Sequence, residues 1–141
     1  MDNLYRDFIL EHYREPHNRG VLEPHDLQFF DSNPTCGDEM SMTVRLDDAN
    51  QRVSDIAFDG RGCAISQASA SILTDELRGL SVDELRAIDP KHVVANLGVP
   101  IGPARLKCAL LPYKVLQGAV IGAEARWPEE AEVLNEGGSA P

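Results

Sequence analysis

The chain has 141 residues, enough for one domain with a sizeable core, and its 43% hydrophobic and 26% charged residues are typical of a globular protein. Its 23 acidic residues against 13 basic ones give a net charge of −10, which argues against binding the phosphate backbone of a nucleic acid. We see no basic segment followed by an apolar run at the start and no apolar run near the ~18 residues of a membrane span. Three cysteines, an odd number, favour reduced thiols over a disulfide framework. We therefore expect a cytoplasmic protein that binds neither nucleic acid nor a membrane.

The N-terminal segment from Asp2 to Glu15 is predicted to be a helix, because its apolar residues recur at helical spacing. They are Leu4, Phe8, Ile9, Leu10 and Tyr13. We expect this stripe to pack in the core; the alternative is a mobile element that docks on a partner or on the functional site. Residues 16–33 follow as a loop, in which 27–30 can form a short strand at a sheet edge. Three histidines, His12, His17 and His25, have no partner at metal-ligand spacing and are expected at the surface.

A β-hairpin is predicted in the middle of the first half. Apolar and polar residues alternate from Met40 to Leu46, as in a half-buried strand, and residues 47–51 are typical of a turn. A second strand is expected from Val53 to Phe58. Because the hairpin returns to its starting end, Cys36 before it and Cys63 after it are expected to lie close together.

The second half is predicted to be helical. Small residues follow Cys63 in a helix expected to end at Gly79, and Ser81 and Glu84 form a capping box for a short helix over 82–88. Another short helix is expected over 90–98, and a longer apolar one over 104–122 that carries Cys108 and is kinked or delayed by Pro112. We expect one domain over residues 1–124, followed by an acidic, disordered tail over 125–141.

The three thiols and one nearby carboxylate have the composition of a metal site. Cys36, Asp38, Cys63 and Cys108 would give four ligands, which suits tetrahedral zinc. Thiolates also hold iron–sulfur clusters, so the residues alone leave the two kinds of site open. A carboxylate in place of a fourth thiolate would suit a site that releases its metal or cluster.

Three motifs that contain these residues resemble those of the IscU/SufU iron–sulfur cluster assembly proteins, which are related to the N-terminal part of NifU. The motifs are Asn33-Pro34-Thr35-Cys36-Gly37-Asp38, then Gly60-Arg61-Gly62-Cys63-Ala64-Ile65-Ser66, then Pro103-Ala104-Arg105-Leu106-Lys107-Cys108-Ala109. The resemblance covers roughly residues 3–122. It implies an α+β fold, with a small, mostly antiparallel three-stranded sheet and helices packed on one side.

The resemblance also implies a metal site made by Cys36, Asp38, Cys63 and Cys108. In the SufU branch this resembles a zinc site at which Cys36 accepts persulfide sulfur from a cysteine desulfurase, so that the protein acts as a zinc-dependent sulfurtransferase. Asp38 would be the ligand most easily displaced. Arg105, one helical turn before Cys108, could pair with Asp38 or support an anionic persulfide.

The alternative branch, IscU, is similar to a scaffold on which a transient [2Fe-2S] cluster is built on Cys36, Cys63 and Cys108 and passed to acceptor proteins. Lys107 stands where IscU proteins carry histidine, which favours SufU. The 44 residues between the second and third cysteines are closer to the length in IscU. We therefore expect sulfur transfer with a desulfurase and a downstream assembly complex, with the cluster scaffold as the alternative and a purely structural zinc domain as a third hypothesis.

Overall fold

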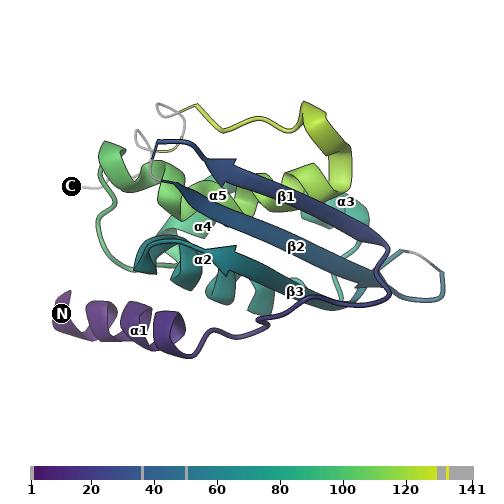
Figure 1. Cartoon of the computed structure of the whole chain (residues 1–141), viewed down its shortest axis with the longest axis horizontal. Helices are drawn as coiled ribbons and strands as arrows, with labels where there is room; N and C mark the ends of the chain where they lie inside the picture. Colours follow the sequence, from purple (N-terminus) through teal and green to yellow (C-terminus); the bar gives the residue numbers. More distant parts are fainter. Residues whose placement is uncertain (1, 36, 50, 130–132, 134–141) are drawn as a thin grey trace.

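The computed structural model describes residues 2–35, 37–49, 51–129 and 133, which form a three-stranded antiparallel sheet with helices on one face (Figure 1). The strands are β1 (Leu27–Asn33), β2 (Asp38–Leu46) and β3 (Val53–Arg61), in the order β1-β2-β3. The main helices are α1 (Asp2–Arg14), α2 (Ala64–Asp75) and α5 (Pro103–Ile121). Three short ones are α3 (Val82–Arg86), α4 (Pro90–Ala95) and the 3₁₀ turn η1 (Gly122–Glu124). The predicted α+β fold is confirmed.

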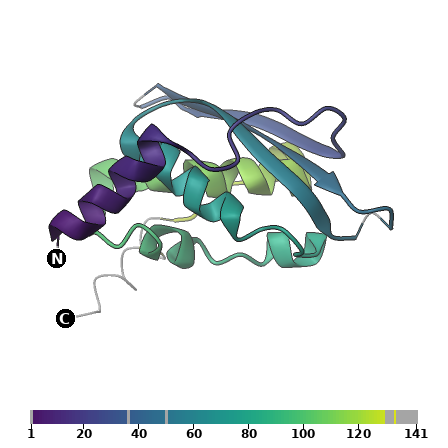
Figure 2. The same cartoon turned by 90° about the horizontal axis from the view of Figure 1, so that it is seen from below.

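Figure 2 shows the order of the layers: α2 and α5 lie under the sheet, and α3 and α4 lie on their far side. The central strand β2 supplies much of the core, because its alternating residues Met40, Met42 and Val44 have no exposed surface. Met42 lies opposite Phe29 of β1 on one side and Phe58 of β3 on the other. The predicted hairpin and the predicted edge strand are therefore both confirmed.

The small residues of α2 allow α5 to approach it closely. Ala68 of α2 and Ala109 of α5 are both fully buried in one apolar cluster, and Ser69 Oγ donates a hydrogen bond to the carbonyl of Ala109 at 2.7 Å. On the other side of α5, Gly118 lies directly against the ring of Phe29, where an added Cβ would come within 2.6 Å of ring atoms. These contacts fix α5 under the sheet.

The helical segments differ from the predictions mainly at their ends. The helix after Cys63 ends at Asp75 rather than at Gly79, and the two short helices end two or three residues earlier than predicted. The capping box at Ser81 and Glu84 is confirmed. Helix α5 begins at Pro103 and continues through Pro112, so the predicted delay is wrong, and the predicted kink stays a prediction.

The prediction that the apolar stripe of α1 packs in the core is wrong for most of its members. Leu4 is 71% exposed, and Phe8 and Tyr13 are 40% and 44% exposed, whereas Ile9 is buried against the cluster of Ala68 and its neighbours. The reason is that α1 lies at the margin of the helical layer and packs on α2 along one side only (Figure 2). The alternative, that α1 docks on a partner, stays a prediction.

The segment after η1 continues along the domain. Ala125 is 6% and Val133 is 4% exposed, and Trp127 packs beside the latter in an apolar cluster with Leu106 and Leu110 of α5. The expected tail at residues 130–132 and 134–141 lies outside the described residues, so its disorder and the boundary after 124 stay predictions.

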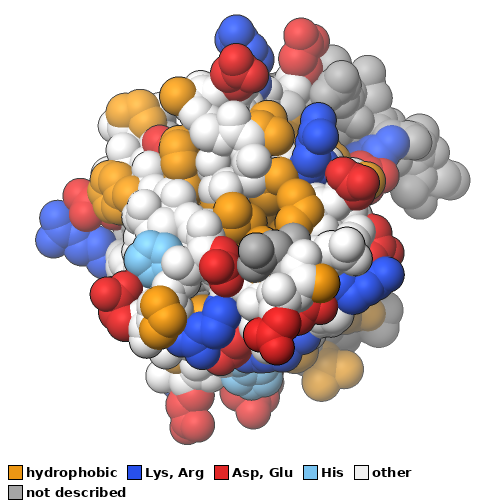
Figure 3. Space-filling model, turned by 90° about the vertical axis from the view of Figure 1, so that its right-hand side faces the viewer, with side chains coloured by type: hydrophobic (Ala, Val, Ile, Leu, Met, Phe, Trp, Pro, Cys, Tyr) orange, Lys and Arg blue, Asp and Glu red, His pale blue; other side chains and the backbone are white. Residues whose placement is uncertain are grey.

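At the end of the molecule where β2 turns into β3, on the right in Figure 1, acidic and basic side chains are interspersed around exposed apolar atoms (Figure 3). None of the helices among the described residues is long and apolar enough to cross a membrane.

Candidate metal and sulfur-transfer site

Three segments that are distant in sequence meet at one end of the sheet. The antiparallel register places Glu39 at the start of β2 opposite Arg61 at the end of β3, so Asp38 and Cys63 become neighbours. Helix α2 begins directly after Cys63, and α5 brings Cys108 to the same place from its second turn. The topological part of the sequence prediction, that the hairpin returns Cys63 toward its starting end, is confirmed.

Asp38, Cys63 and Cys108 form a compact group of possible metal ligands. One ligand atom from each residue can be chosen so that all three lie within 4.8 Å of one another. Asp38 Oδ2 lies 3.6 Å from Cys63 Sγ, and Asp38 Oδ1 accepts a hydrogen bond from the backbone N–H of Cys63 at 3.3 Å. Asp38 and Cys108 are buried, at 4% and 3% exposure.

This geometry fits a tetrahedral metal ion. Zinc–sulfur bonds of about 2.3 Å and zinc–oxygen bonds of about 2.0 Å place neighbouring ligand atoms roughly 3.5–3.8 Å apart. The 3.6 Å between Asp38 and Cys63 is in that range, and the longest separation in the group requires a shift of about 1 Å to close on one ion. Two thiols and a carboxylate are also donors that zinc or iron accepts.

Cys36, the fourth expected ligand, lies outside the described residues, and its roles as ligand and sulfur acceptor stay predictions. The residues on either side of it are held by Asn33, which is 2% exposed. The Asn33 carbonyl accepts from the N–H of Gly37 at 2.8 Å, and its side-chain Oδ1 accepts from the N–H of Thr35 at 3.1 Å. Gly37 has a φ of 77°, which favours glycine at this position.

Residues 4–128 match the family model described as the NifU-like N-terminal domain. The chain belongs to this family. The resemblance to the IscU/SufU proteins is thereby confirmed.

Two curated relatives carry different functional names. A Bacillus subtilis protein named zinc-dependent sulfurtransferase SufU is 37% identical, over 88% of this chain and 94% of its own. A Streptococcus pyogenes protein named iron–sulfur cluster assembly scaffold protein IscU is 33% identical, over 85% and 84% of the two chains.

A solved structure has the same fold. It is described as an iron–sulfur cluster assembly scaffold protein for the SUF system from Fervidobacterium islandicum AW-1. It is 26% identical with a TM-score of 0.70, covering 81% of this chain and 94% of its own.

The turn that enters α2 requires a residue without a side chain in this member of the family. A Cβ on Gly62 would lie 2.6 Å from Ser66 Oγ and 2.7 Å from Asp38 Cγ. Ser66 is fully buried and its Oγ donates to the Cys63 carbonyl at 3.1 Å. Gly62 therefore lets the Asp38 carboxylate reach the start of the helix.

A cleft of about 290 Å³ opens between the β1–β2 turn and the start of α5, and Asp38, Cys63 and Cys108 are not among the residues that line it. Asn33 and Thr35 border it from the β1–β2 turn, and Lys107 and Trp127 border it from α5 and the segment after η1. Lys107 is exposed, as predicted, and its Nζ lies 5.4 Å from the centroid of the Trp127 ring. Arg105 is also exposed, and its support of the site stays a prediction. Sequence analysis missed Trp127, because it falls in a segment whose acidic composition indicated disorder.

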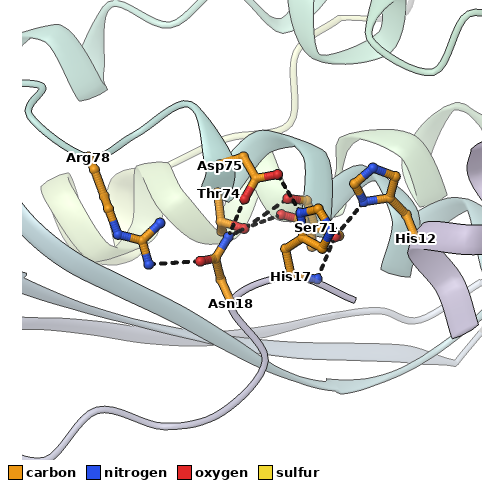
Figure 4. Close-up of polar contacts among 8 residues, drawn as sticks. His12, His17, Asn18, Ser71, Thr74, Asp75 and Arg78 are labelled. Carbon is orange, nitrogen blue, oxygen red and sulfur yellow. Dashed lines mark hydrogen bonds and ion pairs between the residues drawn. The ribbon is translucent and has the colours of Figure 1, made fainter. Parts of the chain in front are cut away.

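A second polar group joins α1 and the following loop to α2 (Figure 4). His12 Nδ1 lies 2.7 Å from Ser71 Oγ, which also accepts from the backbone N–H of His17 at 2.8 Å. The prediction that His12 is a surface histidine is wrong, since it is 8% exposed. Its partner Ser71 is remote in sequence, so no local pattern indicated the burial.

Burial lowers the pKa of His12, and the nearby His17 lowers it further. His17 and His25 are exposed, as predicted. At Asp75, burial alone would raise the pKa, but hydrogen bonds from His17 and Asn18 outweigh it and the pKa is lowered. Both shifts favour the deprotonated form, which is the neutral ring for His12 and the carboxylate for Asp75.

Proposed function

We propose that this protein accepts sulfur from a cysteine desulfurase, at a zinc site made by Cys36, Asp38, Cys63 and Cys108, and passes it on for iron–sulfur cluster assembly. The observation that carries the proposal is the meeting of Asp38, Cys63 and Cys108 within 4.8 Å. The name of the Bacillus subtilis relative, a zinc-dependent sulfurtransferase, supports the same function.

The transfer step is a thiol–persulfide exchange. The Cys36 thiolate attacks the outer sulfur of the desulfurase persulfide, a new S–S bond forms on Cys36, and the desulfurase cysteine leaves as a thiolate. The proton on the outer sulfur stays with it, so atoms and electrons balance without an oxidant. Zinc at the site would keep its cysteine ligands deprotonated and protect them from oxidation.

Asp38 is suited to be the ligand that gives way when Cys36 reacts. A carboxylate is a harder ligand than a thiolate, and this one already has a hydrogen bond to the Cys63 N–H that it can keep when it leaves the metal. We propose that the cleft lined by Thr35 and Lys107, which are next in sequence to Cys36 and Cys108, receives the persulfide-bearing segment of the desulfurase. Arg105, exposed on α5 three residues before Cys108, is proposed to support the anionic persulfide.

The test is sulfide release by a cysteine desulfurase with cysteine and a reductant, in the presence of the zinc-loaded protein. We expect stimulation that is lost in Cys36→Ser and retained in His25→Gln, an exposed residue on another loop. A wild-type protein that binds one zinc per chain but does not stimulate the desulfurase would contradict the proposal.

The second candidate is a scaffold for a transient [2Fe-2S] cluster, favoured by the name of the Streptococcus pyogenes relative and by the thiol donors themselves. Anaerobic reconstitution with iron and sulfide would then give visible absorption that disappears in Cys36→Ala. A colourless wild-type protein would count against it.

The third candidate, a purely structural zinc domain, predicts that the fold is lost when the metal is removed. Thermal melts with and without a chelator test this. A chain that keeps its secondary structure and a cooperative transition after chelation excludes it.

A further inference from the structure

Gln67, in the first turns of α2, is buried, and no described residue hydrogen-bonds to its side chain. The residue is 3% exposed. Among the residues that the structure describes, neither its Oε1 nor its Nε2 has a hydrogen-bond partner. A buried carboxamide in this condition destabilises the fold, so its presence calls for a physical explanation.

The backbone places Gln67 one helical turn after Cys63. The N–H of Gln67 donates to the Cys63 carbonyl at 3.2 Å, so the two residues occupy the same face of the helix. Side chains on a helix lean toward its N-terminus, over the preceding turn. From this general rule we expect the long side chain of Gln67 to extend toward the end of α2 at which Cys63, Asp38 and Cys108 meet.

The same row of α2 shows why the missing partner is informative. Residues at intervals of four give the row Cys63, Gln67, Ser71 and Asp75. Ser71 and Asp75 are bonded by α1 and the following loop, as Figure 4 shows. Asp38 contacts Cys63 through both of its oxygens. Gln67 lies between these two bonded groups, and its amide is the polar group that lacks a partner among the described residues.

The amide of Gln67 can donate hydrogen bonds, which a charged sulfur ligand can accept. A carboxamide carries two N–H donors, and an anionic sulfur is a far better hydrogen-bond acceptor than a neutral thiol. We propose that Gln67 is a positioning residue, whose Nε2–H donates to an anionic sulfur of the metal-loaded or sulfur-loaded site. This inference rests on the proposed function, because it requires a thiolate-ligated metal centre at Asp38, Cys63 and Cys108.

The chain offers a matched control in Gln117 on α5. This glutamine is also buried, at 6% exposure, but its Nε2 donates to the carbonyl of Leu85 at 2.9 Å. Gln→Met keeps the length of the side chain and removes the amide. Gln67→Met and Gln117→Met therefore remove the same chemical group, in one case without a partner among the described residues and in the other with one.

The experiment is titration of the metal-free variants with Co²⁺, followed by the sulfur-to-cobalt charge-transfer absorption. In Gln67→Met we expect cobalt affinity to fall by about tenfold or more, as when partners that orient metal ligands are removed. The charge-transfer band should move to longer wavelength, because the sulfur loses a stabilising N–H donor. Gln117→Met should leave the affinity and the band unchanged.

Thermal melts of the metal-free proteins give a second measurement. Gln67→Met should melt no lower than the wild type, since it removes a partnerless buried amide, whereas Gln117→Met should melt lower. If Gln67→Met does not fold, Gln67→Leu is titrated in its place.

Two results are distinguishable. If the wild type shows the charge-transfer band and Gln67→Met matches it in affinity and wavelength, the role of Gln67 is wrong and the metal site stands. If the wild type itself shows no such band, both the proposed metal site and the role of Gln67 are overturned.

Discussion

Replacing Gly62 with alanine should weaken both metal binding and the fold, and a second substitution should separate the two effects. The new Cβ would lie 2.6 Å from Ser66 Oγ and 2.7 Å from Asp38 Cγ, about 0.8 Å inside the roughly 3.5 Å of normal contact. The φ of Gly62 is outside the range that favours glycine, so the effect is steric and not conformational. Either the carboxylate or the start of α2 must move.

The size of the shift of Asp38 decides whether it can still bind the metal. Ligand distances at a metal site hold within about 0.2 Å, so a shift of about 0.8 Å takes Asp38 out of the coordination shell. The 3.3 Å bond from the Cys63 N–H to Asp38 would lengthen past hydrogen-bonding range as well. We expect zinc affinity to fall about 10- to 100-fold and the free energy of unfolding of the metal-free protein to fall by about 1–3 kcal/mol.

The assay is competition for zinc against a chromophoric chelator, with urea unfolding of the metal-free protein beside it. Adding Ser66→Ala removes one of the two clashes, so the double variant should recover part of the stability but not the zinc affinity. Gly102→Ala is the control, because a Cβ there meets no atom within 4 Å. Wild-type zinc affinity in Gly62→Ala would refute the placement of Asp38 as a ligand.

Two further predictions concern the stability of the fold away from the metal site. The folded state lowers the pKa of His12 below its ordinary 6.5, so the unfolded chain binds more protons and the free energy of unfolding should fall as pH drops below about 6.5. In His12→Asn this part of the pH dependence should vanish, as measured by urea unfolding at several pH values. An unchanged pH dependence would exclude His12 as its source. In Gly118→Ala the Cβ would overlap the Phe29 ring, so the free energy of unfolding should fall by about 1–3 kcal/mol. Adding Phe29→Leu should restore part of that loss, and additive losses in the double variant would contradict the contact.

The strands and the site were predictable where local patterns and topology carried the information. The alternation from Met40 to Leu46 identified β2, and the return of a hairpin to its starting end brought Cys63 to Asp38. Neither step needs knowledge of distant contacts. The three thiols and the nearby carboxylate already indicated Cys108 as a ligand, but no local pattern could fix the position of its helix, which is remote in sequence.

Three features depended on contacts that the sequence does not reveal. Periodicity shows which residues of α1 share a face, but not that Leu4 and Phe8 would stay exposed, at 71% and 40%. His12 is buried because Ser71, 59 residues away, meets its ring. Gln67 carried no signal at all, since a glutamine on a helix of small residues indicates neither a core position nor a ligand. The exposure of Leu4 and Phe8 and the burial of His12 needed the relative placement of α1 and α2.

The described donors of the site come from the central strand and from both helices that pack beneath it, so a bound ion would act as a cross-link across the domain. An ion that binds only the folded chain stabilises it by mass action, by about 2.7 kcal/mol at a free concentration 100 times its Kd. The relation is reciprocal: a partner that pulls Asp38 or the start of α2 away from the ion loosens the tertiary structure, and the looser structure in turn releases the ion. Metal exchange and opening of the domain would then be coupled in one equilibrium, and the melting temperature would rise with the fraction of the protein that holds metal.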